Sequence, residues 1–260
     1  MPEHDAIEDA SGRNVVVTGG STGIGRMIAE GFAAAGATVV ICARNAERCR
    51  DTAAQIDGAF PGTCIGLQAD ISTKDGAADL MRRVAGHTGS VHVLVNNAGS
   101  VNVQPIEEYS EEGWDKTVDI NLKSPFFVTQ QFLPMLRKDA QAERPASVIN
   151  IASVGGMIVG ARENYAYSAS KAGSIHLTHL LAKWLARYSI TVNCIAPGLF
   201  PSEIIKQELD EEGIRQSTAE IPLGRFGDPR SIGGLAQFIA SSYGSYMTGA
   251  VIPLDGGFRL

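Results

Sequence analysis

The sequence predicts a single α/β domain built on a parallel sheet that helices cover on both faces. Short runs of β-branched and apolar residues alternate along the chain with segments of helical length. Most of these runs are apolar throughout, as expected for strands that are buried on both faces. The 260 residues suit one such domain. These features favour a doubly wound sheet of about seven strands.

The elements follow one another in a regular order. We predict strands over residues 14–18, 38–42, 64–68, 91–96, 147–151, 190–195 and 250–254. We predict helices over residues 23–35, 46–57, 74–87, 111–138, 165–188 and 229–241. Residues 198–229 interrupt this rhythm, because they follow a strand end without forming a strand, as is typical of a substrate lid. Residues 1–13 are expected to form a flexible segment before the domain at 14–260.

Composition and charge exclude several classes of protein. The chain carries 22 Lys and Arg against 28 Asp and Glu, a net charge of −6, whereas nucleic-acid-binding proteins are typically basic. The four cysteines form no CxxC pair, which indicates free thiols in a reducing compartment. No signal peptide or membrane span is evident, so we expect a cytoplasmic protein without membrane or nucleic-acid partners. The five histidines lack ligand spacing, and no metal site is expected.

A glycine-rich turn follows the first predicted strand directly. Its sequence is TGGSTGIG, residues 18–25, and an apolar helix begins within it. Glycine permits the tight turn and lets backbone amides approach a pyrophosphate, whose negative charge the helix N-terminus favours. Because a strand precedes it and a helix follows, this turn indicates a dinucleotide site more strongly than glycines alone would.

With this turn, several further segments resemble the short-chain dehydrogenase/reductase family, in the family's order. They are Asp70 in ADIS, NNAG at 96–99, Asn121 in DINL, Ser153 in NIASV, YSASK at 167–171 and PG at 197–198. The resemblance implies a Rossmann fold and an NAD(P)-dependent oxidoreductase. VICAR at 40–44 and YMTGAVIPLDGGF at 246–258 are most similar to the 3-oxoacyl-(acyl-carrier-protein) reductase branch, in particular the β-ketoacyl reductases of rhamnolipid biosynthesis.

The resemblance implies four catalytic residues. They are Asn121, Ser153, Tyr167 and Lys171. Tyr167 and Lys171 share one face of a predicted helix, and a neighbouring ammonium lowers the tyrosine pKa from its usual value of about 10. In the family the tyrosine is the general acid, the lysine also holds the nicotinamide ribose, and the serine orients the carbonyl. The asparagine stabilises a kink in its helix and relays a proton through water. Taken singly, each also fits an ordinary role: a surface lysine, a strand-ending serine or a solvated helix asparagine.

The resemblance also implies which residues bind the cofactor. They are Gly19, Ser21, Thr22, Gly23, Ile24, Gly25, Arg44, Asp70, Ile71, Asn97, Ala98, Gly99, Tyr167, Lys171, Pro197, Gly198 and Ser202. The second predicted strand ends without an acidic residue for a ribose 2′-hydroxyl, and Arg44 there suits a 2′-phosphate. This favours NADP(H) over NAD(H), although Thr22 stands where many such reductases carry a second cation. For Asp70, a turn or helix cap is the alternative to an adenine contact.

Apolar residues after Ser153 and within 198–229 suit an apolar or acyl substrate with one carbonyl group. The alternative is that they only dock the lid onto the core. The lid is rich in acidic residues, which does not favour an acidic carrier protein. Carrier-protein substrates, coenzyme A thioesters and free ketones all stay open. The resemblance implies a homotetramer, and the apolar helix faces by themselves indicate that a dimer or larger assembly is plausible.

We therefore expect an NADPH-dependent carbonyl reductase that acts on a 3-oxoacyl thioester or a similar apolar ketone. One alternative is an NAD(P)-dependent alcohol, polyol or steroid-type dehydrogenase on the same scaffold. Another is a non-catalytic dinucleotide-binding sensor, since a fold alone does not determine function. The sensor is disfavoured because Ser153, Tyr167 and Lys171 are all present.

Overall fold

A computed structural model describes residues 10–160, 162–201 and 211–260. Within these ranges one parallel sheet has seven strands in the order β3-β2-β1-β4-β5-β6-β7. The strands are β1 (Asn14–Thr18), β2 (Thr38–Ala43), β3 (Thr63–Gln68), β4 (Val93–Asn96), β5 (Ala146–Ile151), β6 (Ile190–Pro197) and β7 (Val251–Leu254). The predicted doubly wound α/β domain is confirmed.

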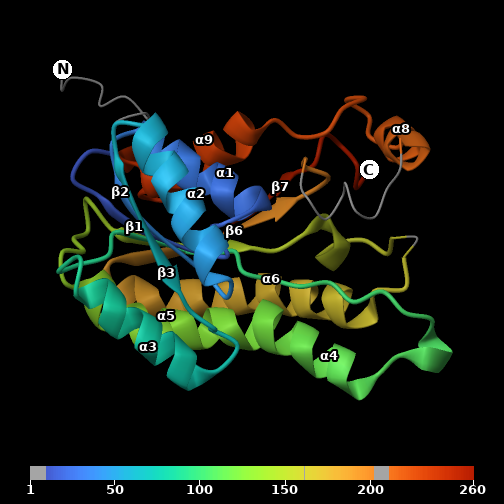
Figure 1. Cartoon of the computed structure of the whole chain (residues 1–260), viewed down its shortest axis with the longest axis horizontal. Coiled ribbons are helices and arrows are strands. Elements are labelled where there is room, and N and C mark those ends of the chain that lie inside the picture. Colours follow the sequence, from blue (N-terminus) through green and yellow to red (C-terminus); the bar gives the residue numbers. More distant parts are fainter. Residues whose placement is uncertain (1–9, 161, 202–210) are drawn as a thin grey trace.

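Helices cover both faces of the sheet (Figure 1). One face carries α1 (Gly23–Ala34), α2 (Ala46–Ala59) and α9 (Pro229–Ala240). The other carries α3 (Lys74–Ala85), α4 (Glu111–Val118), α5 (Ser124–Arg137) and α6 (Tyr165–Leu185). The short helix α8 (Glu211–Ala219) lies within the predicted lid.

The first strand shows why the strands are apolar throughout. Val15 and Val17 belong to the core beneath α1 and α9, whereas Val16 belongs to the core beneath α3, α5 and α6. Successive side chains of a strand point to opposite faces, and both faces are buried here. An uninterrupted apolar run is therefore what this sheet requires.

The predicted helical segment over 111–138 is not one continuous α-helix, and its interruption lies at Asn121, where the resemblance implies a kink. A π-helical turn over Asp119–Lys123 separates α4 from α5. Such turns insert one extra residue and are frequent at functional sites. The predicted helix over 165–188 also changes character near its end, where Ala186–Tyr188 forms a 3₁₀ turn.

The domain begins before residue 14. Ala10 donates its backbone N–H to the Ala35 carbonyl at 2.7 Å and is buried. Arg13 is also buried, and its Nη1 donates to the Ala240 carbonyl at 2.7 Å. Residues 10–13 are therefore part of the packed domain rather than of a flexible segment.

Three further properties of the described ranges concern membrane-spanning helices, groups of metal ligands and disulfides. No helix in them is both long and apolar enough to cross a membrane. No group of three or more His, Cys, Asp and Glu side chains in them is arranged to hold a metal ion. All four cysteines fall within these ranges as buried free thiols, and burial raises the pKa of Cys42 and Cys64 to about 12.

Candidate active site

The predicted site residues that the structure describes gather at one edge of the sheet, where the strands end. Between β1 and β4 the strand order reverses direction, and sheets of this kind bind ligands outside the carboxyl ends of the strands at such a point. The glycine turn follows β1, Asn97–Gly99 follow β4, and Ser153 follows β5. Pro197 and Gly198 stand at the end of β6, and α6 begins at the same edge. Ser202 lies outside the described residues.

Lys171 is a buried lysine in the second turn of α6, with an exposed fraction of 5%. Its Nζ donates to the Ile151 carbonyl at 2.8 Å and lies 5.7 Å from the centre of the Tyr167 ring. Burial lowers its pKa to about 8. Within the described ranges no carboxylate pairs with this ammonium, so its charge is available to stabilise a phenolate on Tyr167.

Ser153 and Tyr167 lie on either side of Gly155. The Ser153 Oγ accepts a hydrogen bond from the Gly155 backbone N–H at 3.1 Å. A Cβ atom on Gly155 would lie 3.5 Å from both Ser153 Oγ and Tyr167 Cε1. Both side chains are half-buried, so each keeps a part that is accessible to a ligand. A hydrogen-bond donor and a proton donor thus stand together at the end of β5.

Asn121 lies in the π-helical turn and is almost fully buried, with an exposed fraction of 1%. Its Nδ2 donates to the Ser100 carbonyl at 2.9 Å and to Ser170 Oγ at 3.1 Å. Its Oδ1 accepts from the Ser100 backbone N–H at 2.9 Å. Ser170 in turn donates to the Tyr167 carbonyl at 2.7 Å. Asn121 therefore ties the segment after β4 to the helix that carries Tyr167.

Asn121→Ala is expected to lower the free energy of unfolding by about 2–4 kcal/mol, because it removes three hydrogen bonds and leaves buried polar groups unpaired. Urea unfolding followed by circular dichroism measures this change. Asn102→Ala is the matched control, since the side chain of Asn102 donates to Gln104 in a half-buried loop. Equal losses in both variants would contradict a special role for the buried amide.

The N-terminus of α1 is open to an anion. Thr22 precedes the helix without a side-chain cap, and the first turn contains no acidic residue. Four other helices begin with a capping side chain, from Asn45, Thr73, Ser110 and Asp228. The first-turn amides of α1 are thus left for an external acceptor, and a pyrophosphate fits this arrangement.

Two glycines of the turn are required by close packing. Gly19 has a positive φ of 64°, and a Cβ there would lie 2.8 Å from the Ala98 Cα. A Cβ on Gly25 would overlap the Gly19 carbonyl and the Asn97 Nδ2. Asn97 Nδ2 donates to the carbonyls of Thr18 and Gly19 at 2.9 and 3.1 Å. The glycine turn and the segment after β4 therefore form one interlocked unit.

Three other predicted cofactor residues differ in their surroundings. Arg44 directly follows β2 and is exposed, with no acidic residue at that strand end. Asp70 Oδ1 accepts from the Ser72 backbone N–H at 3.0 Å, and hydrogen bonds from Ser72, followed by the charge of Arg44, lower the Asp70 pKa. Asp70 thus makes the local turn. Ile71 is buried in the core, which leaves its backbone as the part that can face a ligand.

Three residues that hold the site together were not predicted. Thr18 Oγ1 accepts from the backbone N–H groups of Asn97 and Ala98 at 3.0 and 3.1 Å. Ser100 and Ser170 are the partners of Asn121 described above. Thr18 and Ser170 lie inside the segments TGGSTGIG and YSASK, which was a usable signal, whereas nothing in the sequence distinguishes Ser100.

The fold and this site together define the class of protein: an oxidoreductase that uses a dinucleotide at the edge of a doubly wound sheet. The sequence matches the family described as enoyl-(acyl carrier protein) reductase over residues 19–259. The chain therefore belongs to this family of short-chain dehydrogenases/reductases and is an oxidoreductase.

Known relatives cover nearly the whole chain. The rhamnolipids biosynthesis 3-oxoacyl-[acyl-carrier-protein] reductase of Pseudomonas aeruginosa is 45% identical over 251 residues, 96% of this chain and 97% of the relative. The 3-oxoacyl-[acyl-carrier-protein] reductase FabG of Thermotoga maritima is 35% identical over 246 residues, 95% of this chain and 97% of the relative. The structure of a Pseudomonas aeruginosa RhlG/NADP active-site complex superposes with a TM-score of 0.94 at 44% identity, covering 98% of this chain and 99% of that chain.

Proposed function

We propose that the protein is an NADPH-dependent reductase of 3-oxoacyl thioesters. One observation carries this proposal. The Ser153 Oγ and the Tyr167 ring both lie beside Gly155, and the buried ammonium of Lys171 lies near the same ring. The two relatives described above support it, since each is a 3-oxoacyl-[acyl-carrier-protein] reductase, and the similar solved structure described above is a complex with NADP.

In this proposal the residues of the chain position the carbonyl group and supply its proton. NADPH, when bound, supplies the hydride that reduces the carbonyl carbon. Ser153 donates a hydrogen bond to the carbonyl oxygen and fixes its position. Tyr167 transfers its phenolic proton to that oxygen, and the ammonium of Lys171 stabilises the phenolate that results. Asn121 holds the start of α6 in place through Ser170.

The residues at the cofactor side fit a dinucleotide that carries a 2′-phosphate. The open amides at the start of α1 suit the pyrophosphate, as argued above. We place the 2′-phosphate at Arg44, because a guanidinium at the end of β2 matches it and no carboxylate stands there to bind a free hydroxyl.

Arg44→Ala is expected to raise the KM for NADPH by about ten- to a hundredfold and to leave that for NADH nearly unchanged, because it removes charge-assisted hydrogen bonds to the phosphate. Steady-state kinetics with both cofactors measures this. Arg50→Ala removes an exposed arginine from α2 and is the matched control, expected to change neither KM. An unchanged NADPH preference in Arg44→Ala would refute this assignment.

The substrate class is tested by following NADPH oxidation, with NADH in parallel, against a short 3-oxoacyl coenzyme A thioester and a panel of simple ketones. We expect turnover of the thioester with a clear preference for NADPH. If only the ketones are reduced, the assignment of a thioester substrate is overturned, and the assignment of a reductase activity stands. If NADPH binds but no carbonyl compound is reduced, the reductase itself is overturned and the sensor is favoured.

We further propose that the protein forms a homotetramer, or at least a dimer, through helices α5 and α6. Large apolar side chains are exposed on these helices: Phe126 at 38%, Leu180 at 47% and Trp184 at 56%. Burial of such side chains against a second copy would remove apolar area from water. Sedimentation of the purified chain measures the assembly, and a monomer would contradict this proposal.

A further inference from the structure

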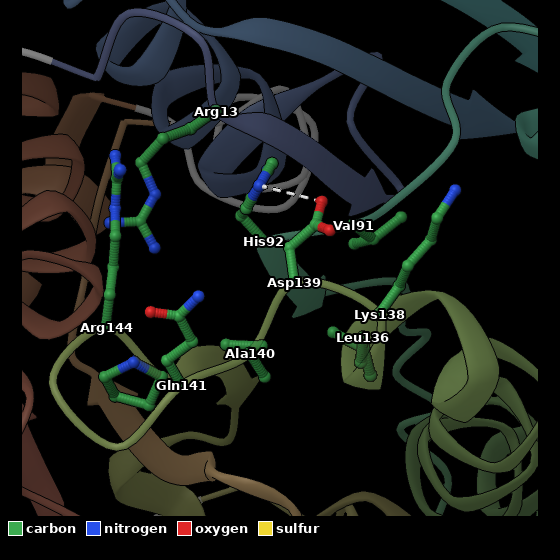
Figure 2. Close-up of a pocket in the computed structure, with 11 residues that line it drawn as sticks. Arg13, Val91, His92, Leu136, Lys138, Asp139, Ala140, Gln141 and Arg144 are labelled. Atoms are coloured by element: carbon green, nitrogen blue, oxygen red, sulfur yellow. Dashed lines mark ion pairs between the residues drawn. The ribbon is translucent and has the colours of Figure 1, made fainter.

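A cavity of about 450 Å³ lies at the opposite edge of the sheet from the candidate active site, where the strands begin (Figure 2). Its walls come from the residues before β1 and β4, from the start of β5 and from the segment between α5 and β5. None of the residues assigned to the catalytic or cofactor sites lines it. It is large enough for a small ligand.

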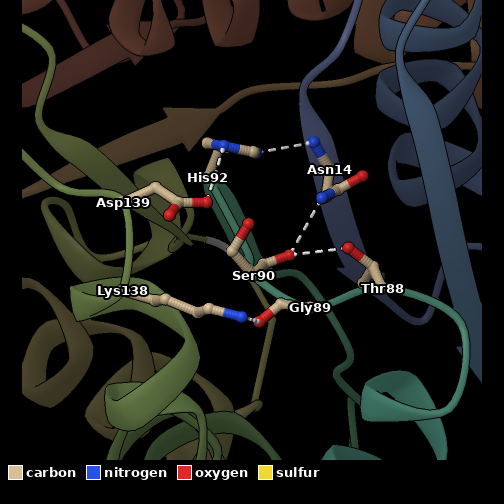
Figure 3. A network of polar contacts seen from close by, with 7 residues as sticks. All are labelled: Asn14, Thr88, Gly89, Ser90, His92, Lys138 and Asp139. Carbon is tan, nitrogen blue, oxygen red and sulfur yellow. Dashed lines mark hydrogen bonds and ion pairs between the residues drawn. The ribbon is translucent and has the colours of Figure 1, made fainter.

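The cavity contains several charged side chains, of which two are already engaged. Lys138 Nζ donates to the Gly89 carbonyl at 3.1 Å (Figure 3). Asp139 is the carboxylate in the wall, and its Oδ2 is directed at His92 Nε2, 3.8 Å away. Within the described ranges no carboxylate pairs with Arg13, Lys138 or Arg144, and of these three cations Arg13 and Arg144 lie close enough for their charges to repel each other.

Arg13 is a buried guanidinium with an unused donor. Its exposed fraction is 8%, and its Nε has no hydrogen-bond partner although it is buried. Its Nη1 bonds only a neutral group, the Ala240 carbonyl. Burial, and then the like charge of Arg144, lowers the Arg13 pKa to about 10. A buried charge without a counter-ion is costly, so an anion between the two arginines would relieve an unfavourable contact.

The walls of the cavity are held in place by hydrogen bonds. The Asn14 backbone N–H donates to His92 Nδ1 at 2.8 Å, and Asn14 Nδ2 donates to the Ser90 carbonyl at 3.1 Å (Figure 3). Gln141 and Arg144 exchange two backbone hydrogen bonds of 3.2 Å, which close a tight turn. This turn presents the Arg144 side chain beside that of Arg13 (Figure 2).

We propose that this cavity binds a phosphate group between Arg13 and Arg144, either as inorganic phosphate or as part of a small phosphate monoester. A planar guanidinium matches the oxygens of a phosphate with paired hydrogen bonds, and two guanidiniums together neutralise its charge. The proposal is independent of the proposed reaction, because the site shares no residue with the catalytic edge.

The test is calorimetric titration of the full chain. The protein is first saturated with NADP⁺, so that the groups that bind the phosphates of the cofactor are occupied. Inorganic phosphate and glycerol 3-phosphate are titrated separately, and the tighter ligand identifies the source of the phosphate group. We expect one site per chain. Arg144→Ala should weaken binding by about tenfold or more, because it removes charge-assisted hydrogen bonds from an exposed residue. Arg82→Ala removes an exposed arginine on α3 and should bind like the parent.

Two results would overturn the proposal. The first is the absence of binding by either ligand, and the second is equal affinity in Arg144→Ala and the parent. Repeating the titration in Arg44→Ala checks that the measured site is not at the cofactor side.

Discussion

Tyr167→Phe is expected to lower kcat by about 10²–10⁴-fold, the range typical of losing a general acid, while the affinity for NADPH stays within about twofold. The phenyl ring keeps the packing beside Lys171 and Gly155, so the substitution removes little besides the acidic hydroxyl. Steady-state kinetics gives kcat, and fluorescence titration gives the NADPH affinity.

Tyr165→Phe is the matched control for this prediction. Tyr165 is the first residue of α6, the helix that also carries Tyr167. Its hydroxyl donates to Glu163 Oε2 at 2.8 Å and not to Ser153 or Lys171. That hydrogen bond to a carboxylate raises the Tyr165 pKa. We expect near-parent kcat for Tyr165→Phe. If Tyr165→Phe were inactive and Tyr167→Phe active, the general acid would be the other tyrosine.

Lys171→Met is expected to abolish turnover and, without cofactor, to stabilise the fold. Burial lowers the pKa of Lys171 from 10.5 in the unfolded chain to about 8 in the folded protein. At neutral pH this shift reduces the free energy of unfolding by about 3 kcal/mol. Losing the hydrogen bond to the Ile151 carbonyl removes about 1 kcal/mol of stabilisation. The free energy of unfolding should therefore rise by about 1–2 kcal/mol at pH 7.

The pH dependence of this stabilisation has a definite sign. The folded state binds the Lys171 proton more weakly than the unfolded state, so the penalty is fully present below about pH 8. The penalty disappears as the pH rises from about 8 to 10.5, and the stability advantage of Lys171→Met should shrink over that range. Urea unfolding at both ends of the range measures this advantage.

The control variant is Lys183→Met, which replaces an exposed lysine of α6 and should change the free energy of unfolding by less than about 0.5 kcal/mol. A less stable Lys171→Met at pH 7 would refute the penalty.

The strands and the site's location were predictable from the sequence because both depend on local pattern. The predicted strand over 14–18 has the observed bounds, since a run of valines between polar residues leaves little choice. Once the sheet is parallel, residues after the strands must meet at one edge, which places Ser153 near Gly99 and the glycine turn. For Asp70, which was predicted to contact the adenine, the alternative of a turn residue could also be found locally, because Ser72 stands two positions away.

What could not be predicted depends on contacts between distant segments. The resemblance implies a kink at Asn121, but its π-helical form has no local signature, because the Asn121 side chain bonds to Ser100 and Ser170, far along the chain. The burial that lowers the Lys171 pKa is likewise set by packing against β5. The prediction that residues 10–13 are flexible was wrong. Their polar composition gives no sign that Arg13 donates a hydrogen bond to the Ala240 carbonyl across the domain.

The buried thiols described with the fold have a consequence for the proposed reaction on acyl thioesters. Cys194 lies in β6, is fully buried and lies close enough to Lys171 that a thiolate at this position would interact with the ammonium. A thiolate in such a place would compete for the acyl group, since thiolates attack thioesters and would leave the chain acylated. Burial raises the Cys194 pKa to about 11, so the sulfur stays protonated and out of reach. The core thus protects the proposed substrate from the protein's own nucleophiles.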